Sequence, residues 1–480
     1  MVKNARRIKW ENKDFVKHGI TLFFEYLVLM SLIFVAIVIR NNGFEDFSIF
    51  FSNQDNVKGV VFSGIAVALL IIVTFIYFYN IKGDFIYKIS NQLMIYAILT
   101  VSVIANYAFG LINIYLRPIS LCCLLMLFVT EKNTAVFMNI VFASYMIVVD
   151  FLMYESNALA ITSMAITFIT GTFAVFLVDG KTSRFKVLLM GGFISIPVML
   201  ASVGIEFSFT DNLVYAFGSG VLTNVLFIVI LPFIEIIFGA VTNFRLSELT
   251  DHKTKLIRNL IKSAQGTFNH SILIATMAEA CSNAIGENPM LARACAYYHD
   301  IGKLKNPEYF AENQTDVNLH DDLSPELSTD IIKSHAKDGA NLIRKRRLPS
   351  ILADIAEQHH GTMPIKYFYA KAKKFTDGQL DMDDFCYQGP KPQTKIAAII
   401  MICDASEAKV RTMNNRSHEL VDKAVREIVE ERMDLDQFTE CDITLRELDI
   451  IRHTITNALA GVYHGRVKYP KLKVGKKNAN

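Results

Sequence analysis

The sequence lacks the cysteine patterns that stabilise secreted proteins or bind zinc. Its seven cysteines include no CxxC pair, and two of them, Cys122 and Cys123, are adjacent within an apolar run. This usage is typical of a reducing compartment, so we expect neither a disulfide framework nor a zinc knuckle. No small-residue cleavage site follows the first apolar run, 20–39, which we therefore expect to be a membrane span and not a signal peptide.

Histidine is scarce in the first half of the chain, and strand patterns are scarce throughout. Only His18 of the eleven histidines precedes residue 245. Hydrophobic residues make up 52% of the chain and the mean hydropathy is +0.31, with the excess concentrated before residue 245. Few segments alternate as strands do. The sequence therefore predicts an all-α protein with a polytopic membrane half and a helical half outside the membrane.

Apolar runs of membrane-spanning length fill the first half. A helix needs about 20 residues to cross a hydrocarbon core of roughly 30 Å. We count about eight spans, of which the fourth is the shortest: 20–39, 59–79, 91–112, 116–130, 134–153, 158–178, 186–206 and 213–240. No repeat and no regularly broken pair of helices occurs among them, so transport is not indicated.

The loops between these runs alternate in charge. Residues 1–18 carry six basic and two acidic residues, and the loops 80–88, 131–133 and 179–186 hold further lysines and an arginine. The alternate loops, 41–57, 154–158 and 206–212, are acid-rich or uncharged. Because Lys and Arg favour the cytoplasmic side, this pattern predicts a multi-pass protein of the plasma membrane with both termini in the cytoplasm.

Few ionisable residues interrupt the runs. They are Glu25, Asp150 and Glu235, while Arg117 opens the fourth run. Such groups are costly in lipid and can mark a functional site. We favour the simpler interpretation, in which Arg117 and Asp150 lie near an interface and Glu235 faces a neighbouring helix.

The second half has the punctuation of a helical domain. We expect a connector at 244–266, a catalytic domain at 267–470 and a disordered tail at 471–480, after a membrane domain at 1–243. Thr267 is the expected cap of a helix that ends at Gly286, and Pro289 starts the next. Further helices are expected from Ser324-Pro325, after Pro349, over 394–411, and near 416–432 and 444–463.

Seven candidate metal ligands lie near the ends of these predicted helices. In order they are His270, His299, Asp300, His335, His359, His360 and Asp404. Imidazole and carboxylate together suit iron, manganese or zinc, and a carboxylate beside a histidine can bridge to a second ion. A lone His-Asp pair is usually a surface pair, and His359-His360 alone might be no more than a helix-end pair. The order H, HD, H, HH, D over five helices favours the metal-site hypothesis.

The same residues carry a family resemblance. The segments "NHSILIATMAEA", "YYHDIGKLKNPEYFAENQ", "EQHHGT" and "GPKPQTKIAAIIMICDASEA" resemble the HD-domain phosphohydrolases. Among these, the chain is similar to the PgpH-type seven-transmembrane phosphodiesterases, which hydrolyse cyclic di-AMP. Members commonly carry a large extracellular domain after the first membrane helix, whereas here the corresponding stretch, roughly 40–58, is short.

The resemblance implies a two-metal centre. One ion would be held by His270, His299, Asp300 and Asp404, and the other by His335, His359 and His360, with Asp300 bridging. It implies iron, with manganese as an alternative. The predicted reaction is in-line attack on phosphorus by an activated water, giving linear pApA.

Substrate contacts are less well defined by the sequence. Asp300 and Lys303 are the predicted catalytic residues, and Lys303 is also placed to contact a phosphate. For Lys303, a solvated lysine at a helix end is the simpler alternative. His320 and Asp321 are candidates for contacts to the substrate or the metal ligands. Tyr367, Phe368 and Tyr369 could stack on a base or lie in the core. The expected partners are cyclic di-AMP and the lipid bilayer, without a nucleic-acid polymer, and a homodimer is left open.

Three other functions compete with this hypothesis. A cyclic di-GMP phosphodiesterase would carry an acid and a GYP element after its His-His pair, whereas this chain has "HHGTMP". A broader nucleotide phosphohydrolase fits the same ligands. A membrane receptor that binds a nucleotide without cleaving it would be expected to have lost ligands, and none is missing.

Overall fold

The computed structural model describes residues 10–40, 47–153, 157–181, 183–206, 210–314, 317–374 and 380–462. These residues form helices and short connections, with no β-strand among them, so the expected all-α fold is confirmed. The chain divides into two compact units, Met1–Arg245 and Leu246–Asn480. The expected disordered tail, 471–480, lies outside the described residues.

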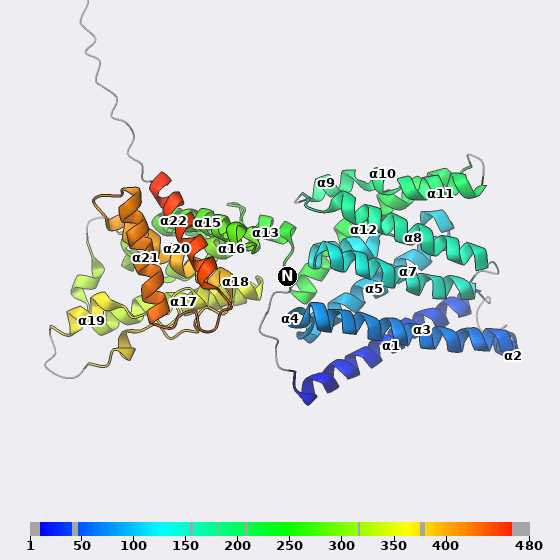
Figure 1. Ribbon diagram of the computed structural model, residues 1–480, viewed down its shortest axis with the longest axis horizontal. Coiled ribbons are helices and arrows are strands. Elements are labelled where there is room, and N and C mark those ends of the chain that lie inside the picture. Colours follow the sequence, from blue (N-terminus) through cyan, green and yellow to red (C-terminus); the bar gives the residue numbers. More distant parts are fainter. Residues whose placement is uncertain are drawn as a thin grey trace, which may run out of the picture. The chain divides into compact units, whose positions relative to one another are not determined.

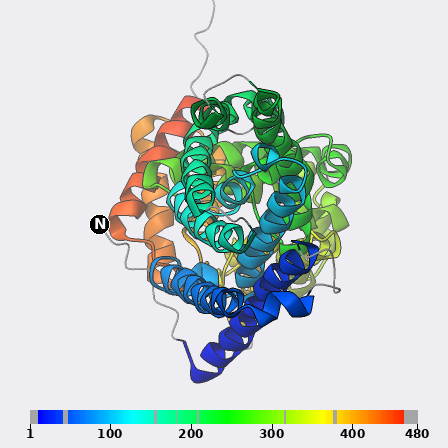
Figure 2. The same cartoon turned by 90° about the vertical axis from the view of Figure 1, so that its right-hand side faces the viewer.

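Long apolar helices make up the first unit and run side by side, as the side view in Figure 1 and the end view in Figure 2 show. Among the described residues, the first five crossings of helix length are single helices: α1 (Asn12–Arg40), α3 (Gln54–Ile81), α5 (Ile89–Gly110), α7 (Lys132–Met153) and α8 (Asn157–Val178). A sixth crossing is built from α9 (Arg184–Leu189), α10 (Gly191–Ile194) and α11 (Ile196–Glu206), and α12 (Asn212–Phe238) is the seventh. Short helices α2 (Phe47–Ser52) and α4 (Gly83–Ile86) flank α3.

The fourth apolar run is the one that does not become a long helix. It contains η1 (Ile114–Leu116), a non-helical stretch and the nine-residue helix α6 (Leu121–Val129). Nine residues rise only about 13.5 Å, too little to cross a bilayer as a helix alone. The side chains from Leu121 to Leu127 are all buried within the bundle. Irregular backbone at this depth is tolerated because surrounding protein covers it.

Contacts between distant loops show that this run still passes through the bundle. At one end, Glu131 pairs with Lys82 at 2.8 Å. At the other, the side chain of Asn113 donates to that of Asn212 at 2.7 Å. Residues 113 and 131 therefore lie at opposite ends. Among the described residues, seven helical crossings and this partly helical run connect the two ends of the unit, and the start of α1 and the end of α12 lie at the same end.

Two ion pairs lie inside the bundle, and they include Asp150 and Glu235 of the apolar runs. Arg117 Nη1 donates to both oxygens of Asp150, at 3.0 and 2.9 Å, and the Ser163 hydroxyl donates to Asp150 at 2.8 Å. Arg117 is 4% exposed and Asp150 is fully buried. Near the other end, Arg184 Nη2 lies 3.1 Å from Glu235. These partners support the simpler interpretation, because each charge holds two segments together.

The ion pair of Arg117 and Asp150 gives a stability test. Asp150→Leu should lower the free energy of unfolding by about 3–5 kcal/mol, because it leaves a buried guanidinium without its carboxylate. The double variant Arg117→Met, Asp150→Leu should recover most of that loss. Thermal unfolding in detergent measures both, with Lys58→Met at an exposed ion pair as the control. If the single and double variants were equally stable, Arg117 and Asp150 would not form a buried ion pair that contributes to stability.

The second unit begins with two short helices, α13 (Asn243–Leu249, which straddles the division) and α14 (Lys255–Ser263). Its main helices are α15 (Gln265–Ile285), α16 (Pro289–Tyr298), α17 (Pro325–Lys345), α18 (Ser350–Gln358), α19 (Lys366–Ala372), α20 (Lys395–Thr412), α21 (His418–Asp434) and α22 (Leu445–Val462). Short turns η2 (Ile301–Lys305), η3 (Pro307–Tyr309), η4 (Ala311–Asn313), η5 (Leu319–Asp322) and η6 (Asp383–Phe385) connect them. Helix α15 packs against α16, α20 and α22, and α17 packs against α18 and η2.

Local capping accounts for four helix limits of the second unit. Asn288, Ser324 and Thr394 each accept a hydrogen bond from a backbone N–H in the first turn of the helix that follows. Gly286 ends α15 with a left-handed φ of 76°, which glycine adopts without strain. These positions agree with the helix starts and stops expected from the sequence.

The expected cap at Thr267 is wrong. Helix α15 starts two residues earlier, at Gln265, and Thr267 lies in its first turn. The backbone N–H of Thr267 is instead satisfied by the side chain of Asn313, at 3.1 Å. Gly266 permits this approach, because a Cβ there would lie 1.8 Å from the carbonyl oxygen of Glu312. A partner 46 residues away thus replaces the local cap.

Candidate metal centre

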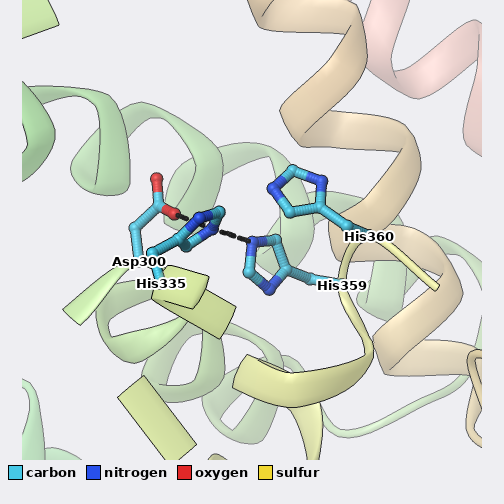
Figure 3. A group of neighbouring side chains, drawn as sticks. All are labelled: Asp300, His335, His359 and His360. Carbon is cyan, nitrogen blue, oxygen red and sulfur yellow. Dashed lines mark hydrogen bonds and ion pairs between the residues drawn. The ribbon is translucent and has the colours of Figure 1, made fainter. Parts of the chain in front are cut away.

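Five helices bring the seven predicted ligands together; most of these ligands lie near helix ends as expected, but His335 and Asp404 lie in the middle of α17 and α20. His270 comes from α15, His299 and Asp300 follow α16, His335 comes from α17, His359 and His360 follow α18, and Asp404 comes from α20. They form two groups of close donor atoms: Asp300 with His335, His359 and His360 (Figure 3), and His270 with His299 and Asp404. Within each group, these atoms lie within 4.8 Å of one another.

Asp300 stands between the two groups. Its Oδ1 lies 3.2 Å from His335 Nε2 and 3.6 Å from His359 Nε2. Its Oδ2 lies 3.3 Å from His299 Nε2 and 3.8 Å from His270 Nε2. One oxygen thus faces each group, as a bridging carboxylate requires.

A glycine allows this close assembly. The turn after Asp300 crosses α17 so tightly that a Cβ on Gly302 would lie 1.9 Å from the carbonyl oxygen of His335. Any other residue would push the turn away from the helix. Gly302 therefore keeps Asp300 within reach of His335.

Backbone carbonyls orient three of the histidines. Nδ1 of His299, His335 and His359 lies 2.7, 2.5 and 2.8 Å from the carbonyl oxygen three residues earlier. A carbonyl only accepts, so each Nδ1 must carry the proton. The lone pair is then on Nε2, which faces Asp300 in each case.

A carboxylate orients the fourth histidine. His270 Nδ1 lies 2.9 Å from Glu407, and its Nε2 lies 3.0 Å from Asp404. Burial by itself lowers the pKa of His270, but its hydrogen bonds to Asp404 and Glu407 outweigh burial and raise that pKa to about 10. Histidine held by a carboxylate on one nitrogen is a common arrangement at metal centres.

The donor atoms fit a metal. Nε2 of His299 and Oδ1 of Asp300 are buried and make no hydrogen bond among the residues that the structure describes, while Asp300 Oδ2 faces the ammonium of Lys303. Burial lowers the pKa of His359 to about 4 and that of His360 well below its usual value. Burial raises the pKa of Asp300, but the charge of Lys303 opposes it, and that pKa is held well below the usual range. Neutral imidazole and ionised carboxylate are the forms that bind cations.

A cavity of about 190 Å³ opens onto these ligands. Lys303 lies in its wall, with its ammonium 2.7 Å from Asp300 Oδ2 and 2.7 Å from Glu312 Oε1. Burial lowers the pKa of Lys303, but the charges of Asp300 and Glu312 reverse that effect and raise it. The remaining lining residues are His270, Phe310, Ile332, His335, His360, Tyr387, Asp404, Ala408 and Arg411.

The other predicted substrate contacts lie elsewhere. His320 Nε2 bonds to the carbonyl oxygen of Tyr309 at 2.9 Å, and its ring packs on Phe368. Asp321 is exposed and faces Lys371 at 3.8 Å. Neither residue lines the cavity, and Tyr367 and Tyr369 do not line it either. Phe368 belongs to a small core with Ala372 and Phe385.

Four residues at the site escaped the sequence analysis: Glu312, Tyr387, Glu407 and Arg411. Glu407 lies three residues after Asp404 on α20, a spacing that puts both on one face and could have revealed it. Tyr387 stacks on His360 with ring centroids 4.2 Å apart. Its segment is held beside the His-His turn by the bond from Tyr387 N to Met363 O, which no local pattern predicts.

Comparison with known proteins agrees with this arrangement. Residues 58–242 match the family described as "7TM receptor with intracellular HD hydrolase", and residues 267–409 match the family described as "HD domain". The cyclic-di-AMP phosphodiesterase PgpH of Bacillus subtilis (strain 168) is 36% identical over 433 residues, which cover 85% of this chain and 60% of that protein. The chain is thus similar to PgpH proteins in both its membrane half and its HD domain.

PgpH of a second organism is also similar, both as a whole protein and in the crystal structure of its HD domain. PgpH of Listeria monocytogenes serotype 1/2a is 38% identical over 381 residues, which cover 77% of this chain and 51% of that protein. A crystal structure of the L. monocytogenes PgpH HD domain in complex with cyclic di-AMP is 46% identical, covers 45% of this chain and all of that chain, and has a TM-score of 0.43. The chain thus spans between half and three-fifths of the length of the two whole relatives.

The family-model matches and the structure together establish the relation to the membrane and the presence of a candidate metal site. The apolar helices and the seven-transmembrane match make this a multi-pass membrane protein. The HD match and the His/Asp groups indicate a site for divalent metal ions.

Glu407 offers a test of the metal site. Glu407→Gln should weaken metal binding by about 10–100-fold, because the amide no longer supports the His270 imidazole with a charge. Competition with a chromogenic chelator measures the affinity, and Glu430→Gln on the exposed face of α21 serves as the matched control. Unchanged metal affinity in the Glu407 variant would show that His270 does not depend on this carboxylate.

Proposed function

We propose that this protein is a metal-dependent phosphodiesterase that hydrolyses cyclic di-AMP to linear pApA at the cytoplasmic face of the membrane. The observation that carries the proposal is Asp300, whose two oxygens face two separate groups of ligands beside a cavity of about 190 Å³. Two metal ions held side by side are a recurrent solution for phosphate ester hydrolysis.

The assignment of residues follows from this geometry. His270, His299 and Asp404 would hold one ion, His335, His359 and His360 the other, and Asp300 would bridge them. When bound, such ions polarise phosphoryl oxygens and activate water at neutral pH. Water then attacks phosphorus, the bond to the 3′ oxygen breaks, and that oxygen takes up a proton.

Lys303 has a separate role in this scheme. Its ammonium lies in the cavity wall, 2.7 Å from Asp300, and can donate to a phosphoryl oxygen next to the ligands. Glu312 holds it there from the other side, and Thr267 donates its hydroxyl to Glu312 at 3.0 Å. Lys303 therefore offsets the negative charge that develops on the phosphoryl group.

Cyclic di-AMP is the favoured substrate for two reasons. The two similar relatives are named cyclic-di-AMP phosphodiesterases. The sequence "HHGTMP" at residues 359–364 also lacks the GYP element of the cyclic di-GMP enzymes it resembles.

Metal identity and orientation belong to the same proposal. The imidazole-rich ligand set suits iron, with manganese as a substitute. The lysines and arginines in segments 1–18, 80–88, 131–133 and 179–186 favour a cytoplasmic location for these segments. They flank the end of the bundle where α1 starts and α12 ends, so the catalytic unit would follow α12 into the cytoplasm.

The reaction is tested with the full chain in detergent, loaded with iron(II) or manganese(II). Cyclic di-AMP should be converted to pApA faster than cyclic di-GMP is hydrolysed. Asp300→Asn should reduce turnover by about 100-fold or more, because the bridging charge is lost. Light scattering on the same sample measures whether the chain is a homodimer.

A matched control is Asp330→Asn, which changes an exposed acid on α17 that pairs only with Lys333 among the described residues. This variant should retain full activity. A metal-loaded, folded protein that cleaves neither dinucleotide would refute the proposed substrate. Binding of cyclic di-AMP without turnover would indicate a receptor.

A further inference from the structure

Two cations line the cavity beside the metal ligands, and their surroundings differ. The ammonium of Lys303 contacts two carboxylates, Asp300 and Glu312, and its side chain is 12% exposed. Arg411 is 42% exposed, and its one ion pair among the described residues is a 3.9 Å contact with Glu407. Lys303 therefore forms two close ion pairs with carboxylates, whereas the guanidinium of Arg411 is more available to an anion.

The position of Arg411 follows from α20. Asp404, Ala408 and Arg411 are spaced by four and three residues, so they share one face of the helix, and all three line the cavity. Arg411 is seven residues from Asp404, a rise of about 10.5 Å, and helical side chains lean back toward the N-terminus. The contact of Arg411 with Glu407, one turn earlier, agrees with that direction.

The intervening residue leaves space. Ala408 is the lining residue between Asp404 and Arg411, and its methyl group is the smallest side chain in the wall. A ligand bound at Asp404 can therefore extend along α20 toward the guanidinium. The cavity thus has a metal-ligand end and, further along the same helix, a cationic end.

We propose that Arg411 binds the second, uncleaved phosphodiester of the substrate. The inference rests on the proposed function, since a cyclic dinucleotide has two phosphodiesters and only one can lie at the metal ligands. A guanidinium donates two parallel hydrogen bonds to phosphate, a geometry that an ammonium cannot match. Arg411 is then a residue that selects dinucleotides over single phosphate esters.

A different role for Arg411 would be indirect. Its contact with Glu407 could support the bond from Glu407 to His270 and so stabilise metal binding. The two roles differ in their consequences. Loss of a phosphate contact affects only substrates with a second phosphate, whereas loss of support for His270 affects every substrate and the metal content.

The experiment compares two substrates in the full-length, metal-loaded protein. Cyclic di-AMP has two phosphodiesters, and bis(p-nitrophenyl) phosphate has one. Arg411→Gln should raise KM for cyclic di-AMP by about 10–100-fold, the effect of losing hydrogen bonds to a charged group, with little change in kcat. For bis(p-nitrophenyl) phosphate, kcat/KM should stay unchanged, as should the metal content. Arg411→Lys should recover part of the loss.

The control is Lys409→Gln, which removes a charge from the same helix turn at an exposed ion pair with Glu427. It should behave as the unaltered protein with both substrates. Equal losses on both substrates, or loss of metal, would overturn the inference in favour of the indirect role, and an unchanged KM for cyclic di-AMP would also overturn it. Unaltered protein that cleaves bis(p-nitrophenyl) phosphate but no dinucleotide would refute the proposed function itself, and the inference with it.

Discussion

The buried carboxylate of Asp300 is the constraint on which the catalytic unit depends. Removing a charged group from water costs several kcal/mol unless other charges surround it. Here Asp300 is 1% exposed, and imidazoles or the ammonium of Lys303 approach both of its oxygens. These groups come from several helices, so the carboxylate is accommodated only when α15, α16, α17 and α18 are all packed in place. Burying this carboxylate costs free energy, and it also requires one particular packing of these helices.

Backbone carbonyls and one carboxylate fix the directions of four ligand rings. A carbonyl three residues earlier holds the Nδ1 proton of His299, His335 and His359, so the lone pair of each ring points to the centre. His270 has its support from Glu407, across the interface between α15 and α20. The precision of the site thus comes partly from the backbone of each helix and partly from packing between helices.

Buried charges are also paired in the membrane unit. Two ion pairs join its segments, Arg117 with Asp150 and Arg184 with Glu235. Such pairs link η1 to α7 and α9 to α12, and they fix the irregular fourth pass beside its neighbours. In the described residues, the start of α1 and the end of α12 lie at the same end of the bundle.

The sequence by itself determined the long apolar helices, most helix limits and the seven candidate ligands. These depend on hydropathy, on caps within one turn and on residue types whose chemistry is recognisable in isolation. Only the tertiary structure decided that Thr267 is no cap, that the fourth run forms a short helix, and that His320 and Asp321 lie away from the cavity. The spacing of Glu407 and Arg411 from Asp404 places them on one face of α20, but only the tertiary structure shows that Glu407 contacts His270 from 137 residues away. Contacts of that range depend on how helices pack, and no local pattern in the chain encodes them.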